Sequence, residues 1–496
     1  MDDNTYQVAC RSSMVGVFSH RMWAAVITTW LVLFGRGSYS DPSRDASARE
    51  IGRLMETLSS RGQFSGCALV AEHGHVLYRK AFGFADTADG RKLTEDTPFN
   101  IASVTKQFTA MAIMMLAEKK QLDYDDLLSR YIPEFASLPH ASGITLRHLL
   151  THTSGIPDFG DLAVEDDTRL TETSLIATLV AKDALFSSPG RQYRYSNPGY
   201  RLLAVVIERV SRMAYSSFLR SRIFQPLGML HTVVYDRPEA LPARCAVGYD
   251  PFGQRLDVVA VAVPGDGGIF STIDDLFKWD QALYTDRLVR QSTLVQAFTP
   301  AVVREGTSTY GFGWNIAGSG AGKYVWHTGN QAGFRAFIER RFDDRTTVIL
   351  LTNVGNSKRV EICDALLEIL AGRPYRLPRR SGAEALYTRI RVSGVDAAIR
   401  EFSELKAAHG DDYDLGESEL NTLGYQLLYG DKRVADAVAI FKLNTIEHST
   451  SSNAFDSLGE AYRVHGDIEL ARQSYQTAVK LDPQNLHAST MLKELK

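Results

Sequence analysis

The stretch of residues 103–116 constrains this chain more than any other, because it places a lysine in the first turn of an apolar helix. Its positions 108–116 carry almost only apolar side chains, which is the pattern of a buried helix. Lys106 therefore enters the interior, where burial favours the neutral amine. Ser103 stands three residues earlier, on the same helix face. A neutral amine beside a hydroxyl can accept its proton, so the pair predicts a serine nucleophile.

A second serine and lysine have this spacing at Ser403 and Lys406. About one such pair is expected by chance in a chain of this length, so spacing alone is weak support. The helix around the second pair is charged and amphipathic, which is typical of a solvated face. We therefore take only the first pair as a candidate site.

Length, net charge and cysteine content limit the number of domains, the kinds of partner and the cofactors that we expect. A chain of 496 residues exceeds one hydrophobic core, so we expect two or three domains. The net charge of −3, without a long basic run, argues against nucleic acid as a partner. The four cysteines show no CxxC spacing, so they predict neither a zinc site nor a disulfide framework. We expect free thiols at Cys67, Cys245 and Cys363, and no metal or cofactor.

Residues 22–34 form an uncharged apolar stretch preceded by His20 and Arg21 and followed by small residues. A membrane-spanning helix needs roughly 20 such residues, and this shorter stretch fits the core of a signal peptide. We expect residues 1–40 to be a signal peptide cleaved near Ser40, with an uncleaved anchor as the alternative. Either case places the rest of the chain outside the cytoplasm, in the periplasm or the extracellular space.

Hydrophobic periodicity predicts the elements around the serine. We expect a helix over 48–58, a hairpin of strands at 67–71 and 76–84, and an extended run at 99–103. A short helix is expected over 122–132, ended by Pro133. Further strands are expected at 310–315, 324–330, 334–338 and 346–353, followed by a helix over 360–370.

Two polar turns contain candidate site residues. Tyr195, Ser196 and Asn197 precede an apolar helix, so Tyr195 could shuttle a proton and Asn197 could hydrogen-bond a substrate. The tripeptide alone predicts only a turn. His152 follows a short helix, and a capping or loop-fixing role suits it at least as well as a catalytic one.

The Pro- and Arg-rich stretch 373–382 predicts a linker, and residues 383–496 are helical and repetitive. Leu423-Gly424 recurs thirty-five residues later as Leu458-Gly459, and Ala437 with Phe441 recurs thirty-four residues later as Ala471 with Tyr475. This pattern resembles the tetratricopeptide repeat, a helix-turn-helix unit whose small residues let helices pack closely. An ordinary helical bundle is the alternative.

Three motifs occur in one order: Ser103-x-x-Lys106, Tyr195-x-Asn197 and His327-x-Gly329. Together they resemble the class C beta-lactamase and penicillin-recognising serine hydrolase family, over about residues 47–372. The resemblance implies an α+β fold, with an antiparallel sheet flanked by helices and a helical lobe. The active site would lie between the sheet and the lobe, and an all-α repeat domain would follow.

The resemblance also assigns roles to residues. Ser103 would attack the carbonyl and form an acyl-enzyme, while Lys106 takes or relays the proton. Tyr195 would protonate the leaving group and later activate water. Asn197 would orient Tyr195, Lys106 or the substrate amide. The backbone N–H groups of Ser103 and Asn330 would form the oxyanion hole, in which each donor is typically worth about 3 kcal/mol.

His327 departs from the beta-lactamase pattern, which has Lys-Thr-Gly there. Histidine is mostly neutral at pH 7, so it offers a substrate carboxylate no permanent charge. This favours the esterase and aminopeptidase-like branches of the family, in which histidine also occurs there. We therefore predict a serine hydrolase of esters or small amides and peptides. The alternatives are a beta-lactamase or D,D-carboxypeptidase and, from another class, a catalytically retired scaffold that binds a protein or peptide partner through its repeats.

Overall fold

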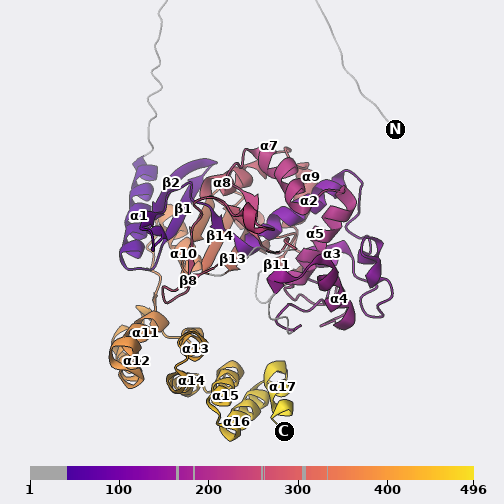
Figure 1. Cartoon of the computed structure of the whole chain (residues 1–496). Coiled ribbons are helices and arrows are strands. Elements are labelled where there is room, and N and C mark those ends of the chain that lie inside the picture. Colours follow the sequence, from indigo (N-terminus) through magenta and orange to yellow (C-terminus); the bar gives the residue numbers. More distant parts are fainter. Residues whose placement is uncertain are drawn as a thin grey trace, which may run out of the picture. The chain divides into compact units, whose positions relative to one another are not determined.

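The structure is a computed structural model that describes residues 42–162, 167–182, 185–257, 261, 263–303, 309–331 and 333–495 (Figure 1). The apolar stretch at 22–34, expected to be a signal peptide or anchor, lies outside these residues. Within them, no helix has both the length and the apolar character needed to cross a membrane.

Among the described residues, an antiparallel sheet of eight strands forms the centre of the first domain (Figure 1). Its order is β10-β11-β12-β13-β14-β15-β1-β2. The strands are β10 (Val302–Val303), β11 (Thr309–Tyr310), β12 (Asn315–Ala317), β13 (Tyr324–Gln331), β14 (Phe334–Arg341), β15 (Thr347–Thr352), β1 (Gly66–Glu72) and β2 (His75–Phe82). The fold is therefore the α+β arrangement expected from the motifs.

Helices cover both faces of this sheet (Figure 1). Strand β15 is buried along its whole length, as its run of apolar and β-branched residues requires. Helices α1 (Pro42–Ser60) and α10 (Arg359–Leu370) pack on one face through Leu54 and Leu366. Helices α2 (Thr105–Glu118) and α8 (Ile273–Ala282) belong to the larger core on the other face.

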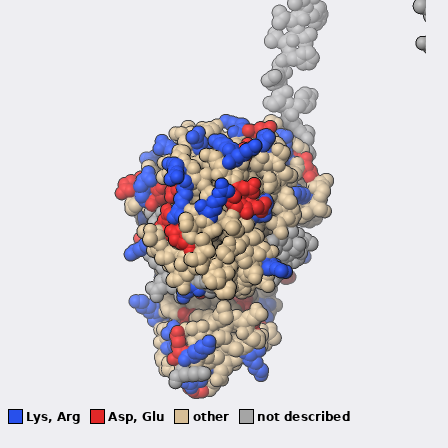
Figure 2. Space-filling view, turned by 90° about the vertical axis from the view of Figure 1, so that its right-hand side faces the viewer, with Lys and Arg blue, Asp and Glu red and all other residues tan. Residues whose placement is uncertain are grey.

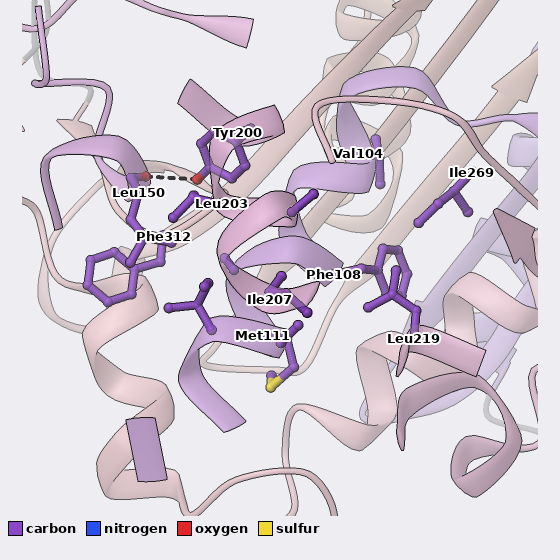
Figure 3. Packing of buried hydrophobic residues seen from close by; sticks show 14 of the residues in the cluster. Val104, Phe108, Met111, Leu150, Tyr200, Leu203, Ile207, Leu219, Ile269 and Phe312 are labelled. Carbon is purple, nitrogen blue, oxygen red and sulfur yellow. Dashed lines mark hydrogen bonds between the residues drawn. The ribbon is translucent and has the colours of Figure 1, made fainter. Parts of the chain in front are cut away.

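The helical lobe is built around α2 and α5 (Asn197–Ser211). Figure 3 shows their side chains interleaved in one apolar cluster, in which Phe108 and Met111 come from α2 and Leu203 and Ile207 from α5. The other helical elements of the lobe are α3 (Leu146–Leu150), α4 (Glu172–Lys182), α6 (Tyr215–Leu219), the π-helical turn η5 (Arg220–Phe224), α7 (Gln225–Leu227) and α9 (Gln291–Leu294). This packing buries the helix that contains Lys106.

A small sheet delivers the chain to that helix. Strand β5 (Phe99–Asn100) pairs with β9 (Ile269–Ser271), which also pairs with β6 (Val233–Val234). The 3-10 turn η1 (Ala102–Val104) follows β5 directly and runs into α2. Two further hairpins are β3 (Phe84–Asp86) with β4 (Arg91–Lys92), and β7 (Gly248–Tyr249) with β8 (Arg255–Leu256).

The C-terminal region is helical, as expected (Figure 1). Successive helices pack against one another, and glycines face aromatic rings at two equivalent places. A Cβ on Gly424 would lie 2.5 Å from the ring of Phe441, and one on Gly459 would lie 2.8 Å from that of Tyr475. The elements are β16 (Arg380–Ser381), α11 (Gly382–Ser393), α12 (Val395–His409), β17 (Tyr413–Asp414), α13 (Glu417–Tyr425), η9 (Gln426–Gly430), α14 (Val434–Glu447), α15 (Ser452–His465), α16 (Ile468–Leu481) and α17 (Leu486–Glu494).

Two expected elements are wrong. In place of one strand over 310–315, the short strands β11 and β12 flank a bend at 311–314. In place of a helix over 122–132, the chain forms the short 3-10 turns η2 (Leu128–Arg130) and η3 (Pro133–Phe135). The side chain of Asp126 accepts from the backbone N–H of Asp123, at 2.8 Å. Such bonds offer the backbone an alternative to the helix, so the apolar periodicity does not decide the conformation here.

Charged side chains are distributed without a dominant sign on the face drawn in Figure 2, where Lys and Arg are interspersed with Asp and Glu. The thiols of Cys67, Cys245 and Cys363 are free, as expected, and those of Cys67 and Cys363 are buried. Burial raises the pKa of both of these thiols. They are therefore protonated, weakly reactive core residues.

Candidate active site

Ser103 lies half-buried in η1, at the start of the buried helix. The preceding residue, Ala102, has a left-handed backbone with φ of 46°, which is unusual for a residue other than glycine. The side chain of Asn100 accepts from the Ala102 N–H at 2.8 Å and supports this turn. The serine therefore lies at the N-terminal end of α2, where the helix dipole favours negative charge.

The amine of Lys106 is in contact with three oxygens. Its Nζ lies 3.0 Å from Ser103 Oγ, 2.8 Å from Asn197 Oδ1 and 2.8 Å from the carbonyl oxygen of Asp266. The side chain is wholly buried, and this burial lowers the pKa of the amine to about 8 against the nearby charges of Asp266 and Asp158. A neutral amine has two N–H donors, which the amide and carbonyl oxygens accept, so its lone pair faces Ser103.

Tyr195 is a further polar group in contact with the serine. Its side chain is hydrogen-bonded to that of Ser103, and burial raises the pKa of its hydroxyl well above the ordinary value. The Nζ of Lys106 lies 4.8 Å from the centre of the Tyr195 ring. The hydroxyl is therefore a protonated phenol in the resting site, able to hand a proton to a group bound at the serine.

Asn197, at the start of α5, is oriented by Asp158. The Asn197 backbone N–H donates to Asp158 Oδ1 at 2.9 Å, and its Nδ2 donates to Oδ2 at 3.2 Å. A carboxylate only accepts hydrogen bonds, so it selects the amide orientation that turns Oδ1 toward Lys106. The arrangement thus settles which atom of Asn197 faces the lysine.

Strand β13 lies directly beside the turn η1 that contains Ser103. On one edge β13 pairs with β14 along its whole length. On the other edge β12 pairs with it only as far as Trp326, so the second half of β13 lies beside η1 there. A Cβ on Gly329 would overlap the carbonyl oxygen of Ile101, which shows how closely the strand approaches the turn. Asn330 is exposed at this point and pairs across the hairpin with Arg335.

His327 is brought to the same region, but its ring is engaged by the protein. Its Nδ1 lies 2.7 Å from the carbonyl oxygen of Thr328, and its Nε2 lies 3.0 Å from the hydroxyl of Tyr310. Burial raises the pKa of Tyr310 well above its ordinary value, so its hydroxyl keeps its proton and can donate to the ring nitrogen. One donor and one acceptor on the ring match a neutral imidazole. The ring therefore orders β13 and the Tyr310 hydroxyl and presents no fixed charge.

Fixed positive charge lies on the far side of Asn330. Arg359, at the start of α10, donates to Asn330 Oδ1 at 2.6 Å, and its buried Nε has no hydrogen-bond partner among the described residues. Burial and the charge of Arg335 lower the pKa of Arg359 to about 10, and burial also lowers that of Arg335. Among the described residues, no carboxylate offsets either charge.

The motifs do not contain several residues that complete the site. Asp158 follows the polar turn 151–157, and Asp266 lies in a glycine-rich loop whose Gly265 has a φ of 137° and approaches the backbone of Tyr200. Only a Pro-Asp pair and a Gly-rich loop mark these two positions in the sequence. Tyr310 and Arg359 carry no local signal, because strand pairing and helix packing bring them to the site.

His152 supports a loop. It has a left-handed backbone with φ of 56°, and its Nδ1 accepts from the Ser196 N–H at 3.1 Å. Its ring lies 4.2 Å from that of Tyr195. The loop-fixing role expected as one alternative is therefore what the contacts show. Among the described residues, no group of acidic, cysteine and histidine side chains could hold a metal ion.

Comparison with known proteins assigns the chain to a family. The sequence model described as "Beta-lactamase" matches residues 50–372. Penicillin-binding protein 4* of Bacillus subtilis is 37% identical over 351 residues, which cover 66% of this chain and 77% of that protein. The putative penicillin-binding protein PbpX of the same organism is 33% identical over 303 residues, covering 60% and 72%. The octameric penicillin-binding protein homologue from Pyrococcus abyssi superposes with a TM-score of 0.61 at 25% identity, over 69% of this chain and 81% of that one.

Proposed function

The chain belongs to the beta-lactamase family, and within it we propose a serine hydrolase that cleaves esters or small amides and peptides through an acyl-enzyme. Ser103 is the nucleophile, Lys106 its base and Tyr195 the acid. The buried amine of Lys106 carries this proposal, since its Nζ lies 3.0 Å from Ser103 Oγ and its pKa is lowered to about 8. A substantial fraction of such an amine is neutral near neutral pH, as a general base requires.

The steps follow from these positions. Lys106 takes the proton of Ser103 as Oγ bonds to the substrate carbonyl carbon, and the carbonyl oxygen becomes an oxyanion. The backbone N–H groups of Ser103 and Asn330 stabilise this oxyanion. Tyr195 protonates the departing alcohol or amine as its bond to the carbonyl carbon breaks. Water then attacks the acyl-enzyme carbonyl and gives a proton to Tyr195. The bond to Ser103 Oγ breaks, the acid leaves, and Lys106 returns its proton to Oγ.

His327, in the third motif, supports the proposal of substrates that have no carboxylate to be bound by a fixed positive charge at this position. Both ring nitrogens of His327 have protein partners, so it does not replace the lysine that binds a substrate carboxylate in the beta-lactamase pattern. Short-chain esters and small peptides fit this arrangement. Asn197 supports the base, because its Oδ1 accepts a hydrogen bond from the Lys106 amine.

A beta-lactamase or D,D-carboxypeptidase is the second candidate. Arg335 and Arg359 flank Asn330 without an offsetting carboxylate among the described residues, so a substrate carboxylate would be stabilised beside the oxyanion hole. Two of the relatives are named as penicillin-binding proteins. The same catalytic steps apply, with the lactam or peptide nitrogen as the leaving group.

We also propose that the protein works outside the cytoplasm, exported through residues 1–40 or anchored by residues 22–34. Residues 47–372 are the catalytic domain, 373–382 a linker and 383–496 tetratricopeptide-like repeats with a possible protein or peptide partner. The two glycine-to-ring contacts, Gly424 with Phe441 and Gly459 with Tyr475, recur at the repeat spacing and support the repeats.

Hydrolysis and labelling test the function together. The wild type and Ser103→Ala would be assayed on a short-chain nitrophenyl ester, a chromogenic cephalosporin and D-alanyl peptides, and treated with a fluorophosphonate and penicillin. We expect ester or small-peptide turnover and an adduct on Ser103, with both lost in Ser103→Ala while folding is retained. Faster turnover of the cephalosporin or D-alanyl peptides would favour the second candidate. A wild type that takes no adduct would be a retired scaffold, and the proposal would be wrong.

A further inference from the structure

At the start of α10, Arg359 contacts strand β13, and the residue before it, Lys358, contacts the C-terminal region. Arg359 donates to Asn330 Oδ1 at 2.6 Å. Lys358, directly before it, points to the C-terminal region, where its Nζ donates to Asp414 Oδ2 at 2.5 Å and to Glu419 Oε1 at 2.9 Å. One short segment thus joins the active site to residues that lie outside the matched family domain.

The Lys358 contacts are partly shielded from water. The exposed fractions of the side chains are 23% for Lys358, 15% for Asp414 and 13% for Glu419. Burial opposes the charge of the lysine, but the two carboxylates outweigh it, so the pKa of Lys358 is raised. Removing the amine would leave Glu419 without its cation and Asp414 with only the guanidinium of Arg379, 3.9 Å away. Losing the cation of a partly buried carboxylate costs more than breaking an exposed ion pair.

Both carboxylates are held by the backbone of the C-terminal region. Glu419 also accepts from Ser381 Oγ at 2.5 Å and from the Ala383 N–H at 3.1 Å. Asp414 lies in β17, which pairs in parallel with β16. The C-terminal helices therefore determine where the Lys358 amine lies, and the backbone at 358–359 transmits that position to the Arg359 guanidinium.

We propose that Lys358 is a positioning residue through which the C-terminal helices hold Arg359 and Asn330 in place for the reaction at Ser103. The inference rests on the proposed function, because it gives the helical domain a part in that same site. Asn330 supplies one of the two oxyanion donors, and a displacement of about 1 Å at such a group can cost as much as a hundredfold in rate. Anything that moves the C-terminal helices thereby changes hydrolysis.

Substitutions in the full-length protein test this link. Lys358→Met should lower kcat for the ester about tenfold, with a smaller change in KM, because the oxyanion contact matters most in the transition state. Lys358→Arg should restore most of the rate. Glu419→Gln should act in the same direction, and the double variant with Lys358→Met should lose less than the product of the two single losses. The matched control is Lys406→Met, which removes an exposed ion pair with Glu447 within the C-terminal helices.

Equal kcat values for the wild type and Lys358→Met, or an equal loss in Lys406→Met, would overturn the inference. A wild type with neither turnover nor a fluorophosphonate adduct would instead refute the proposed function. In that case, hydrogen exchange of β13 still tests whether Lys358 holds the strand in position, independently of any activity. Faster exchange in Lys358→Met than in Lys406→Met is expected, and equal exchange would show that Lys358 does not hold the strand.

Discussion

The amine of Lys106 has no contact with solvent, and its chemistry follows from that burial. Lys406, which follows a serine at the same spacing, has a side chain that is 60% exposed and pairs with Glu447. Its serine, Ser403, donates to the Ile399 carbonyl of its own helix at 3.4 Å. Identical spacing therefore produces a buried amine beside a serine in one helix and a surface ion pair in the other, because the first helix enters the apolar core.

The pH dependence of hydrolysis should report the Lys106 amine. Because burial lowers its pKa to about 8, the neutral base becomes populated as the pH rises through that value, and kcat/KM should rise with it. Ester hydrolysis measured from about pH 6 to about pH 9.5 tests this, with the Ser103→Ala rate subtracted as background. A flat profile through pH 8 would contradict a lysine base.

The same shift predicts how stability depends on pH. The folded pKa lies below the unfolded value of about 10.4, so the unfolded chain binds more protons between about pH 8 and that value. The contribution of Lys106 to the free energy of unfolding is fully present above about pH 10.4 and is lost as the pH falls through about 8. Within this pH window, the free energy of unfolding, measured by denaturant titration, should therefore rise more steeply with pH in the wild type than in Lys106→Met.

Asp158→Asn should disturb the base through Asn197. An asparagine at 158 has one oxygen for the two Asn197 N–H groups that now donate to Asp158, so one of these groups would face an NH2 donor and the orientation of Asn197 would be weakened. Removing the carboxylate also removes a charge that raises the pKa of Lys106, so that pKa should fall further. We expect kcat to drop about tenfold or more, with the rising limb of the pH profile moved to lower pH.

The control for Asp158 is Asp125→Asn, which breaks an exposed pair with Arg147 elsewhere in the lobe. It should leave both kcat and the profile within error of the wild type. A lower kcat in Asp158→Asn without a shifted limb would mean that Asp158 only stabilises the loop.

At the scale of elements, the site depends on close backbone approaches around α2. Strand β13 reaches η1 at Gly329, and the loop before β12 reaches the start of α2 at Gly313, where a Cβ would lie 2.8 Å from the Lys106 carbonyl oxygen. Gly313 also has a φ of 79°, which side chains disfavour. Glycine at these two positions lets strand and helix backbones meet, and this contact sets the distance between the serine and the oxyanion strand.

Gly329→Ala should separate β13 from the nucleophile. The added Cβ overlaps the Ile101 carbonyl oxygen, so the strand must move and carry the Asn330 N–H with it. Loss of one oxyanion donor typically costs about a hundredfold or more in kcat, and we expect a loss of that order. The control is Gly322→Ala at the β12–β13 hairpin tip, where a Cβ meets nothing within 4 Å. Equal kcat in the two variants, measured on the same ester, would contradict this role for the strand.

At the scale of the whole molecule, neighbouring C-terminal helices pack against one another, and α11 contacts both α12 and α13. Their stability is therefore a sum of neighbouring contacts, and damage to one contact spreads to the neighbouring helices. The contact at Lys358 connects these helices to the sheet domain, so the state of the helices and the rate at Ser103 are expected to change together.

Gly459→Ala should destabilise the C-terminal helices selectively. Its Cβ would lie 2.8 Å from the Tyr475 ring, which must shift, and such overpacking typically costs about 1–3 kcal/mol. Hydrogen exchange should accelerate across α15 and α16, with β1 and β15 unchanged. The control is Gln473→Ala at an exposed position of α16. Acceleration of the same size in the control would show that the glycine-to-ring contact is unimportant.

Local pattern determined much of the fold. Alternating and continuous apolar runs placed β1, β2, β13, β14 and β15, and helical periodicity placed α1, α2, α5 and α10. The helix predicted at 122–132 was wrong because hydrogen bonds from its backbone to aspartate side chains outweighed a weak helical pattern. The sequence alone also placed Ser103 beside Lys106, because that contact lies within one turn of one helix.

Only the tertiary structure decided how the remaining groups serve that pair. Asp158, the Asp266 carbonyl, Tyr310 and Arg359 reach the site through strand pairing and loop packing between segments far apart in the chain, which no local periodicity encodes. The ring partners of His327 and the connection from Lys358 to Asp414 and Glu419 arise in the same way. Short-range spacing determines which residues share a helix face, whereas burial and orientation depend on everything packed around that face.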